Sequence, residues 1–182
     1  GVRDISPLRG LISGLTYANN AGDATNDIDI LTGAAIDSTN VYWMALASTL
    51  VKQSDVNWVV GTNQGGLDTG VVGDSDYYIW LIARSDTGVV DVLFSLSSTA
   101  PTMPTSYDFR RLIGWFKRTA GAIVVFKISE TEGGGLYFLW TSPPLDIDLA
   151  ATLTTSRRTD ALSVPLTFAV EAHVRISIVD AA

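Results

Sequence analysis

The 182-residue sequence contains no cysteine, and this absence excludes several classes of chemistry at once. Disulfide bonds, thiolate nucleophiles and thiolate metal ligands are all ruled out. The compartment stays open, because a cysteine-free chain works in either redox state. The sequence also has a single histidine, His173, and one imidazole without thiolate partners cannot build a His-based metal site.

Charged residues are scarce, at 17% of the chain against roughly 25% in an average soluble domain. The hydrophobic share of 47% excludes a disordered chain. So few charges leave apolar surface that a monomer would expose, which favours an oligomer. The longest apolar runs reach only about half of the ~20 residues that a membrane helix needs, so no membrane insertion is expected.

The charge that is present is mostly negative, with a formal net charge of −7. Residues 1–83 hold nine aspartates, no glutamate and three basic residues. An acidic surface repels phosphate backbones, so no nucleic-acid partner is expected. The sequence has no signal peptide and begins with Gly1. We therefore expect a piece of a longer polypeptide or a processed product.

Helix signals are almost absent, whereas runs rich in Val, Ile, Thr and aromatic residues recur between turn residues. This spacing predicts an all-β fold, an antiparallel β-sandwich for which a jelly-roll-like topology is one option. Residues 1–10 are predicted to be an N-terminal connecting segment, and residues 11–182 a single β-sandwich domain. The predicted strands are Leu11–Ala18, Asp27–Leu31, Val41–Ala47, Thr49–Lys52, Trp58–Gly61, Tyr77–Arg84, Val89–Ser95, Arg110–Lys117, Ala122–Ser129, Leu136–Trp140, Leu145–Leu149 and Leu166–Val179.

Three of these segments carry the clearest patterns. Tyr77–Ala83 and Val89–Phe94 flank Ser85-Asp86-Thr87-Gly88, whose residue types predict a hairpin turn. Tyr77–Arg84 is apolar on both faces, so it should be a central strand or lie under a partner subunit. Leu166–Val179 alternates apolar and polar residues with period two, which predicts one buried and one wet or interfacial face.

Several ordered motifs resemble segments of a known protein family. They are NNAGDATNDIDI (Asn19–Ile30), VVGTNQGGLDTG (Val59–Gly70) after Trp58, YYIWLIARSDTGVVDVLFS (Tyr77–Ser95), APTMPTSYDFRRLIGW (Ala100–Trp115) and LSVP (Leu162–Pro165). Together they resemble the distal region of tail-fibre proteins of tailed bacteriophages and prophages, over roughly Gly10 to Pro165. The resemblance implies a β-rich domain at or near a virion tail tip, usually trimeric, that contacts the host surface. Lys127–Tyr137 and the strand after Pro165 depart from the pattern, so specificity is expected there.

Catalytic and metal-binding patterns are weak. His173 lies between Glu171 and Arg175 on the polar face of its predicted strand, which favours a surface or interface position over a general base or metal ligand. Asp23, Asp27 and Asp29 lack the register of a calcium-binding loop, so a solvated face is favoured. No pair of carboxylates is selected for glycoside hydrolysis. We expect no catalytic residues, no metal, no cofactor and no enzymatic activity.

Aromatic and polar loop residues are better candidates for ligand contacts. Sugar rings stack on Trp and Tyr while polar loop side chains supply hydrogen bonds. The candidate receptor-binding residues are Asn63, Gln64, Asp68 and Tyr107. Trp58 is near this loop, but a core position is favoured for it, and Trp43, Trp80, Trp115 and Trp140 should be core or interface. Arg110-Arg111 and Arg157-Arg158 could bind an anionic glycan or pair with aspartates between subunits.

The expected function is therefore attachment of a phage tail fibre to its bacterial host. The expected partners are other copies in a homotrimer, other virion tail proteins, and a bacterial surface glycan or protein. Two alternatives remain open. One is a head or tail decoration protein without receptor binding, and the other is a carbohydrate-binding module or polysaccharide hydrolase.

Overall fold

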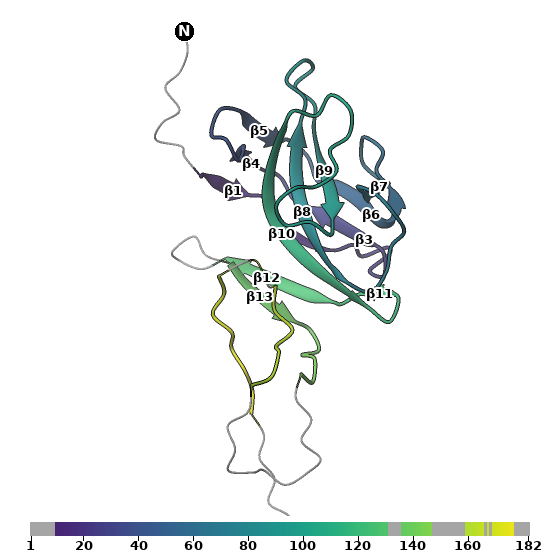
Figure 1. Cartoon of the computed structure of the whole chain (residues 1–182), viewed down its shortest axis with the longest axis vertical. Coiled ribbons are helices and arrows are strands. Elements are labelled where there is room, and N and C mark those ends of the chain that lie inside the picture. Colours follow the sequence, from purple (N-terminus) through teal and green to yellow (C-terminus); the bar gives the residue numbers. More distant parts are fainter. Residues whose placement is uncertain (1–9, 131–135, 147–158, 166, 168, 177–182) are drawn as a thin grey trace, which may run out of the picture. The chain divides into compact units, whose positions relative to one another are not determined.

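The computed structural model describes residues 10–130, 136–146, 159–165, 167 and 169–176. The chain divides into two compact units, Gly1–Pro143 and Pro144–Ala182. The described residues form strands and no helix, so the all-β prediction is confirmed. Figure 1 labels the strands, which are β1 (Ile12–Gly14), β2 (Tyr17–Asn19), β3 (Asp27–Ile30), β4 (Gly33–Ile36), β5 (Trp43–Leu46), β6 (Leu50–Asn57), β7 (Gln64–Leu67), β8 (Asp76–Ala83), β9 (Val90–Ser95), β10 (Phe109–Thr119), β11 (Ala122–Ile123), β12 (Phe126–Glu130) and β13 (Leu136–Trp140).

The strands of the first unit form three sheets. The largest has the order β11-β10-β8-β9-β7-β6-β3-β2, and the others are β1-β4-β5 and the β12–β13 hairpin. Most neighbours are antiparallel, but β7 runs parallel to both β6 and β9. The predicted antiparallel β-sandwich did not foresee these two parallel pairings, and the large sheet is mixed. β7 is not among the predicted strands, and Gln64, which was treated as a loop residue, begins it.

The large sheet is nearly closed into a barrel, because β2 at one end reaches β10 near the other. The Tyr17 hydroxyl oxygen on β2 accepts a 3.0 Å hydrogen bond from the backbone N–H of Trp115 on β10. Gly114 makes this approach possible, since a Cβ there would lie 2.3 Å from the Tyr17 ring. Burial raises the pKa of Tyr17 to about 12 despite this hydrogen bond, so its hydroxyl stays neutral.

The core of this barrel is filled by alternate residues of its strands. Side chains of β3, β8, β9 and β10 supply most of it, including Ile28, Ile79, Phe94 and Phe116. Tyr77 stacks on Phe116 with ring centroids 5.5 Å apart, and Phe94 meets Phe116 edge-on at 5.0 Å. Buried aromatic contacts of this kind stabilise the fold beyond their buried area.

The β8–β9 hairpin confirms the turn predicted for Ser85–Gly88. The Arg84 N–H donates to the Val89 carbonyl and the Gly88 N–H donates to the Arg84 carbonyl, each at 3.0 Å. Gly88 has a φ of +72°, which glycine adopts without strain. β8 lies between β10 and β9, and its residues Tyr77–Ala83 are all buried. The predicted central position of this strand is confirmed.

Three predicted strands of the first unit have different structures, and one of them, Ala122–Ser129, is divided into β11 and β12. Leu11–Ala18 is divided into β1 and β2 because Gly14 and Leu15 both have positive φ values, +65° and +58°, that no strand can continue through. Trp58–Gly61 is not a strand. The N–H groups of Trp58 and Val59 donate to the Leu67 and Gly65 carbonyls of β7, and the Val59 and Gly61 carbonyls accept from a buried side chain, as the next subsection describes.

The second unit, Pro144–Ala182, contains no strand among its described residues. The Leu166–Val179 prediction is therefore wrong for residues 167 and 169–176, while 166, 168 and 177–179 lie outside the described residues. Val170, Val174 and Ile176 remain 49, 58 and 78% exposed. Period-two alternation of apolar and polar residues is typical of strands, but a strand also requires backbone hydrogen bonds to a neighbouring strand. Leu145 and Asp146 are not in a strand either, and the rest of the predicted Leu145–Leu149 lies outside the described residues.

Candidate ligand-binding site

A groove of about 450 Å³ lies beside the β8–β9 turn of the first unit. Three segments supply its walls: the residues after β6, the β8–β9 turn, and the loop that precedes β10. Its lining is mainly apolar with two threonine hydroxyls and one charged side chain, and consists of Trp58, Val60, Arg84, Thr87, Val89, Pro104, Thr105 and Tyr107. A concave apolar surface with a few polar groups is the usual composition of a small-ligand site.

Two aromatic side chains define the groove. Trp58 is partly exposed, and Tyr107 meets it edge-on with ring centroids 5.1 Å apart. Tyr107 itself is buried, with 7% of its surface exposed. Burial raises the pKa of Tyr107, and the nearby Asp91 raises it further while Arg84 lowers it. The phenol is therefore neutral at physiological pH, and the exposed ring surface here belongs to Trp58.

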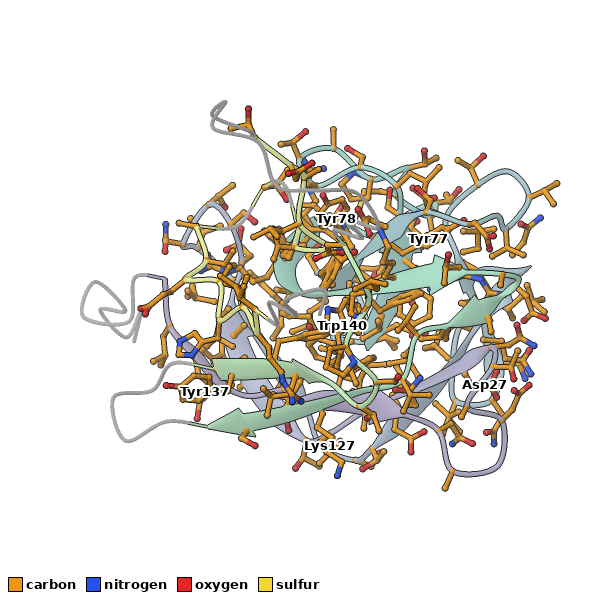
Figure 2. All side chains as sticks on the ribbon, turned by 90° about the horizontal axis from the view of Figure 1, so that it is seen from below. Asp27, Tyr77, Tyr78, Lys127, Tyr137 and Trp140 are labelled. Atoms are coloured by element: carbon orange, nitrogen blue, oxygen red, sulfur yellow. The ribbon has the colours of Figure 1, made fainter. Side chains whose placement is uncertain are left out.

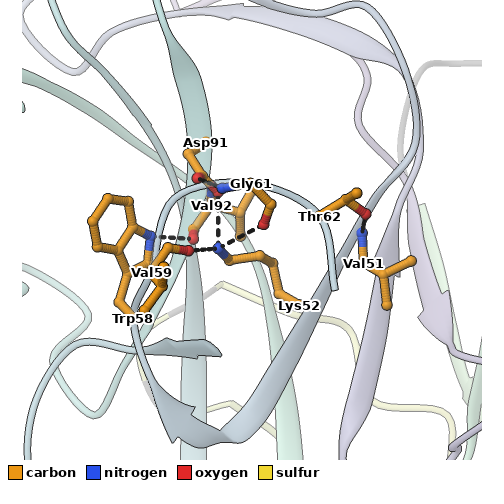
Figure 3. Close-up of polar contacts among 8 residues, drawn as sticks. All are labelled: Val51, Lys52, Trp58, Val59, Gly61, Thr62, Asp91 and Val92. Carbon is orange, nitrogen blue, oxygen red and sulfur yellow. Dashed lines mark hydrogen bonds and ion pairs between the residues drawn. The ribbon is translucent and has the colours of Figure 1, made fainter. Parts of the chain in front are cut away.

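A buried ion pair holds the Trp58 segment in place (Figure 3). The Lys52 ammonium on β6 lies 3.1 Å from an Asp91 carboxylate oxygen on β9, and both side chains are almost fully buried. Lys52 also donates to the carbonyls of Val59 at 2.7 Å and Gly61 at 3.2 Å. Burial lowers the pKa of Lys52, and Asp91 opposes that shift by favouring the charged form.

The Asp91 carboxylate of this ion pair also holds residues 58–61 in place. The Asp91 carboxylate accepts a 2.7 Å hydrogen bond from the Gly61 N–H. The Trp58 indole N–H donates to the Val92 carbonyl at 3.0 Å, and the Lys52 ammonium lies 5.4 Å from the centre of the Trp58 ring. Residues 58–61 are thus held by buried side chains in addition to the backbone hydrogen bonds of Trp58 and Val59 to β7. These contacts fix the orientation of the Trp58 ring.

Charged and hydroxyl groups of the β8–β9 turn border the groove. Arg84 donates two hydrogen bonds to the Asp86 carboxylate, at 2.9 and 2.6 Å. Ser85 donates its hydroxyl to Asp108 at 2.6 Å, which ties the turn to the loop that carries Tyr107. Because the Arg84 guanidinium is paired with the Asp86 carboxylate, and the two side chains are 32 and 54% exposed, the groove presents little uncompensated charge. This arrangement suits a neutral ligand.

The structure brings only one of the four sequence-predicted site residues to the groove. Tyr107 lines it, whereas Asn63, Gln64 and Asp68 are not among its lining residues. Asn63 and Gln64 are exposed at the start of β7, and the Asn63 N–H donates to the Val51 carbonyl at 2.9 Å. Asp68 has a structural task, because its carboxylate accepts the Thr102 N–H at 2.9 Å and so ties down the loop after β9.

The sequence analysis missed most of the groove. A core position was favoured for Trp58 over ligand contact, yet Trp58 lines the groove and is partly exposed. Thr87, Val89 and Thr105 gave no signal, since the groove forms only when three separate segments fold together. The sequence offered only the predicted Ser85–Gly88 turn and the motif Ala100–Trp115, which are separate segments of the chain. Of the other tryptophans, Trp80 and Trp115 are each 3% exposed, as predicted for core positions.

The other polar candidates fold into structural roles. The Asp23 carboxylate accepts the N–H groups of Thr25 and Asn26, forming a local turn, and Asn20 donates to Asp29. Burial raises the pKa of Asp27, and the like charges of Asp23, Asp55 and Asp29 add to this shift. The His173 side chain is 65% exposed and lies 3.6 Å from Glu171, in the predicted surface position.

The arginine pairs that were considered as anion sites also have other neighbours. The Arg110 guanidinium lies 5.8 Å from the centre of the Trp80 ring, and Arg111 donates to the Gly10 carbonyl at 3.1 Å. Arg157 and Arg158 lie outside the described residues. Neither Arg110 nor Arg111 lines the groove.

Within the described ranges, no group of three or more histidine, aspartate or glutamate residues is arranged to hold a metal ion. The same ranges contain no helix long and apolar enough to span a bilayer. Comparisons with family models, curated proteins and solved structures found no match to this chain.

Proposed function

We propose that this chain is the distal part of a tail-fibre protein of a tailed bacteriophage or prophage, and that it attaches the virion to the bacterial surface. The proposal is supported by the ordered motifs between Asn19 and Pro165. Those motifs supply strand β3, the loop after Trp58, the β8–β9 hairpin and the segment leading into β10. They therefore include the residues that line the groove.

The groove is the proposed attachment site, and its ligand is a neutral sugar unit of a bacterial surface glycan. The observation that carries this proposal is the partly exposed ring of Trp58, fixed in an apolar groove beside the Thr87 and Thr105 hydroxyls. A pyranose ring has apolar C–H faces that stack on an aromatic ring and hydroxyls that bond with polar rim groups. The compensated charge of Arg84 gives no advantage to an anionic ligand.

Attachment by such a shallow site depends on several copies acting together. A fibre that presents the groove in each copy of a homotrimer, and a virion with several fibres, raises the apparent affinity without new contacts. The low charge of the chain supports an assembled state, because a monomer would expose more apolar surface. Other tail proteins of the virion are the proposed partners along the fibre.

The test compares two arginine substitutions at exposed threonines. Thr105→Arg places a long charged side chain in the groove, whereas Thr69→Arg changes an exposed position that does not line it. The labelled protein is incubated with a panel of bacterial strains and with their isolated surface polysaccharides. We expect wild type and Thr69→Arg to bind at least one strain, and Thr105→Arg to bind at least 10-fold more weakly, about 1.4 kcal/mol.

Three results would contradict the proposal or redirect it. Equal binding by both variants would exclude the groove as the site. Failure of the wild-type protein to bind any strain or polysaccharide would favour a decoration protein without a receptor. Release of oligosaccharides from a bound polysaccharide would favour a polysaccharide hydrolase instead.

A further inference from the structure

Arg84 is the one residue with a charged side chain among those that line the groove. It follows directly after β8, and Figure 2 shows Tyr77 and Tyr78 near the start of that strand. The main chain of Arg84 is fixed within the hairpin, because its N–H donates to the Val89 carbonyl and its carbonyl accepts from the Gly88 N–H, each at 3.0 Å. The position of the guanidinium then depends on what the side chain itself contacts.

The Asp86 carboxylate holds the Arg84 guanidinium at two points. Nε of Arg84 donates to one carboxylate oxygen at 2.9 Å, and Nη2 donates to the other at 2.6 Å. This paired geometry is the one in which arginine generally recognises carboxylates. An acidic sugar would bring a carboxylate of the same shape. Asp86 therefore already occupies the edge of the guanidinium that such a ligand would use.

A second carboxylate adds negative charge to this border of the groove. Asp108 accepts hydrogen bonds from the Ser85 hydroxyl at 2.6 Å and from the Ser85 N–H at 3.3 Å. The hydrogen bond to Asp86 raises the pKa of the Arg84 guanidinium, and the charge of Asp108 adds to this shift. The same hydrogen bond lowers the pKa of Asp86. Two carboxylates around one guanidinium repel an anionic ligand.

The pair with Asp86 leaves part of the guanidinium available to a neutral ligand. A guanidinium has five N–H donors. Asp86 accepts from Nε and Nη2, which uses two of these donors. The others can donate to sugar hydroxyls, which carry no charge that the two carboxylates would repel.

We propose that Asp86 decides the class of sugar that the groove accepts. By binding Arg84 it excludes acidic sugars such as uronic acids, and it keeps the guanidinium in place to donate to the hydroxyls of neutral ones. Without the charge of Asp86, the carboxylate of a uronic acid would take over the two hydrogen bonds from Nε and Nη2. The inference rests on the proposed function for the groove as the ligand site, and it adds the residue that separates neutral from acidic ligands.

The test measures binding of the labelled full chain to beads that carry matched sugars. The pairs are glucose and glucuronic acid, galactose and galacturonic acid, and mannose and mannuronic acid, whose members differ only in a hydroxymethyl group against a carboxylate. Asp86→Asn keeps the shape of the side chain and removes its charge. We expect it to bind at least one of the three acidic sugars about 10-fold or more strongly than wild type does.

Two further variants identify the cause of this gain. Asp55→Asn, at an exposed position that does not line the groove, removes the same charge from the chain and should not bind acidic sugars more strongly. Arg84→Gln/Asp86→Asn lacks the released guanidinium and should lose the gain. Circular dichroism checks that each variant is folded, which is expected for Asp86→Asn because that side chain is 54% exposed.

Two outcomes would overturn the inference. One is that Asp86→Asn gains no binding to any of the three acidic sugars. The other is that Asp55→Asn or the double variant gains as much as Asp86→Asn. The proposed function is judged separately: a gain that requires Arg84 would support the role of Asp86 even if wild type bound no bacterial strain. Conversely, strain binding that is lost in Thr105→Arg would support the attachment site even if Asp86→Asn gained nothing.

Discussion

At the scale of single residues, the most consequential group is the buried Lys52–Asp91 pair. Each of its charges is compensated by the other and by backbone groups of Val59 and Gly61. Such a pair is costly to break, because removal of one partner leaves the other charge buried and unpaired. Here the same contacts also hold the segment that carries Trp58. Stability and the shape of the groove therefore depend on one interaction.

Lys52→Met should remove about 3–5 kcal/mol from the free energy of unfolding, since Asp91 would remain buried without a cation. Lys117→Met is the matched control, because Lys117 forms an ion pair with Asp76 whose side chains are 30 and 26% exposed. That loss should be no more than about 1 kcal/mol. Urea denaturation at neutral pH measures both values. Equal losses for the two variants would contradict this account of the buried pair.

Asp37 gives a second prediction, about pH. Burial alone would raise the pKa of its carboxyl, but the Thr39 hydroxyl and the N–H groups of Tyr42, Thr39 and Val41 donate to it and lower the pKa overall. The unfolded state then binds more protons as the pH falls. The stabilisation is present above the ordinary aspartate pKa of about 3.9 and is lost as the pH falls through the lower folded value.

Asp37→Asn should therefore lose about 1–3 kcal/mol of unfolding free energy at pH 7. The difference from wild type should shrink as the pH is lowered below about 4, because the Asp37 carboxyl of the unfolded wild-type chain then takes up a proton that the folded chain binds only at lower pH. Urea titrations at pH 7 and pH 3 make the comparison. Asp55→Asn, at an exposed position, is the control and should change stability by less than about 0.5 kcal/mol. A difference that does not vary with pH would contradict the assignment.

At the scale of elements, the sequence predicted those structures that a short stretch of residues determines by itself. The β8–β9 hairpin follows from Ser85–Gly88, because a turn and its two strands are encoded in one short stretch. The parallel pairings of β7 were not predictable in this way, since β7 was not among the predicted strands and its partner β9 is distant in sequence. Residues 169–176 show the converse case. Their alternation is clear, but a strand also needs a partner, which sequence periodicity does not reveal.

The near-closure of the barrel gives the element-scale prediction. A methyl group at position 114 would meet the Tyr17 ring at 2.3 Å, and that ring is buried and held by its hydrogen bond to Trp115. Gly114→Ala should cost about 1–3 kcal/mol of unfolding free energy by overpacking. Gly73→Ala is the control, because nothing lies within 4 Å of its added methyl. Thermal and urea denaturation should separate the two variants, and a neutral Gly114→Ala would contradict the close approach of β2 and β10.

At the scale of the whole molecule, scarcity of charge connects the proposed features. The proposed ligand of the apolar groove is neutral, and the one charged side chain that lines the groove is paired. The composition favours an oligomer, which stays a prediction. The groove was hidden in the sequence, because its walls come from segments around Trp58, Thr87 and Tyr107 that meet only in the folded chain. Asn63 and Gln64 remain the sequence-based alternative for ligand contact.

The most direct test of the central claim, that the groove is the attachment site, is nuclear magnetic resonance mapping of a bound polysaccharide fragment on the nitrogen-15-labelled protein. The five tryptophan indole N–H signals are assigned by substitution, so each ring can be followed separately. The account predicts concentration-dependent shifts at the Trp58 indole and at the backbone amides of Thr87, Thr105 and Tyr107. Shifts confined to Asn63 and Gln64, with Trp58 unchanged, would contradict it.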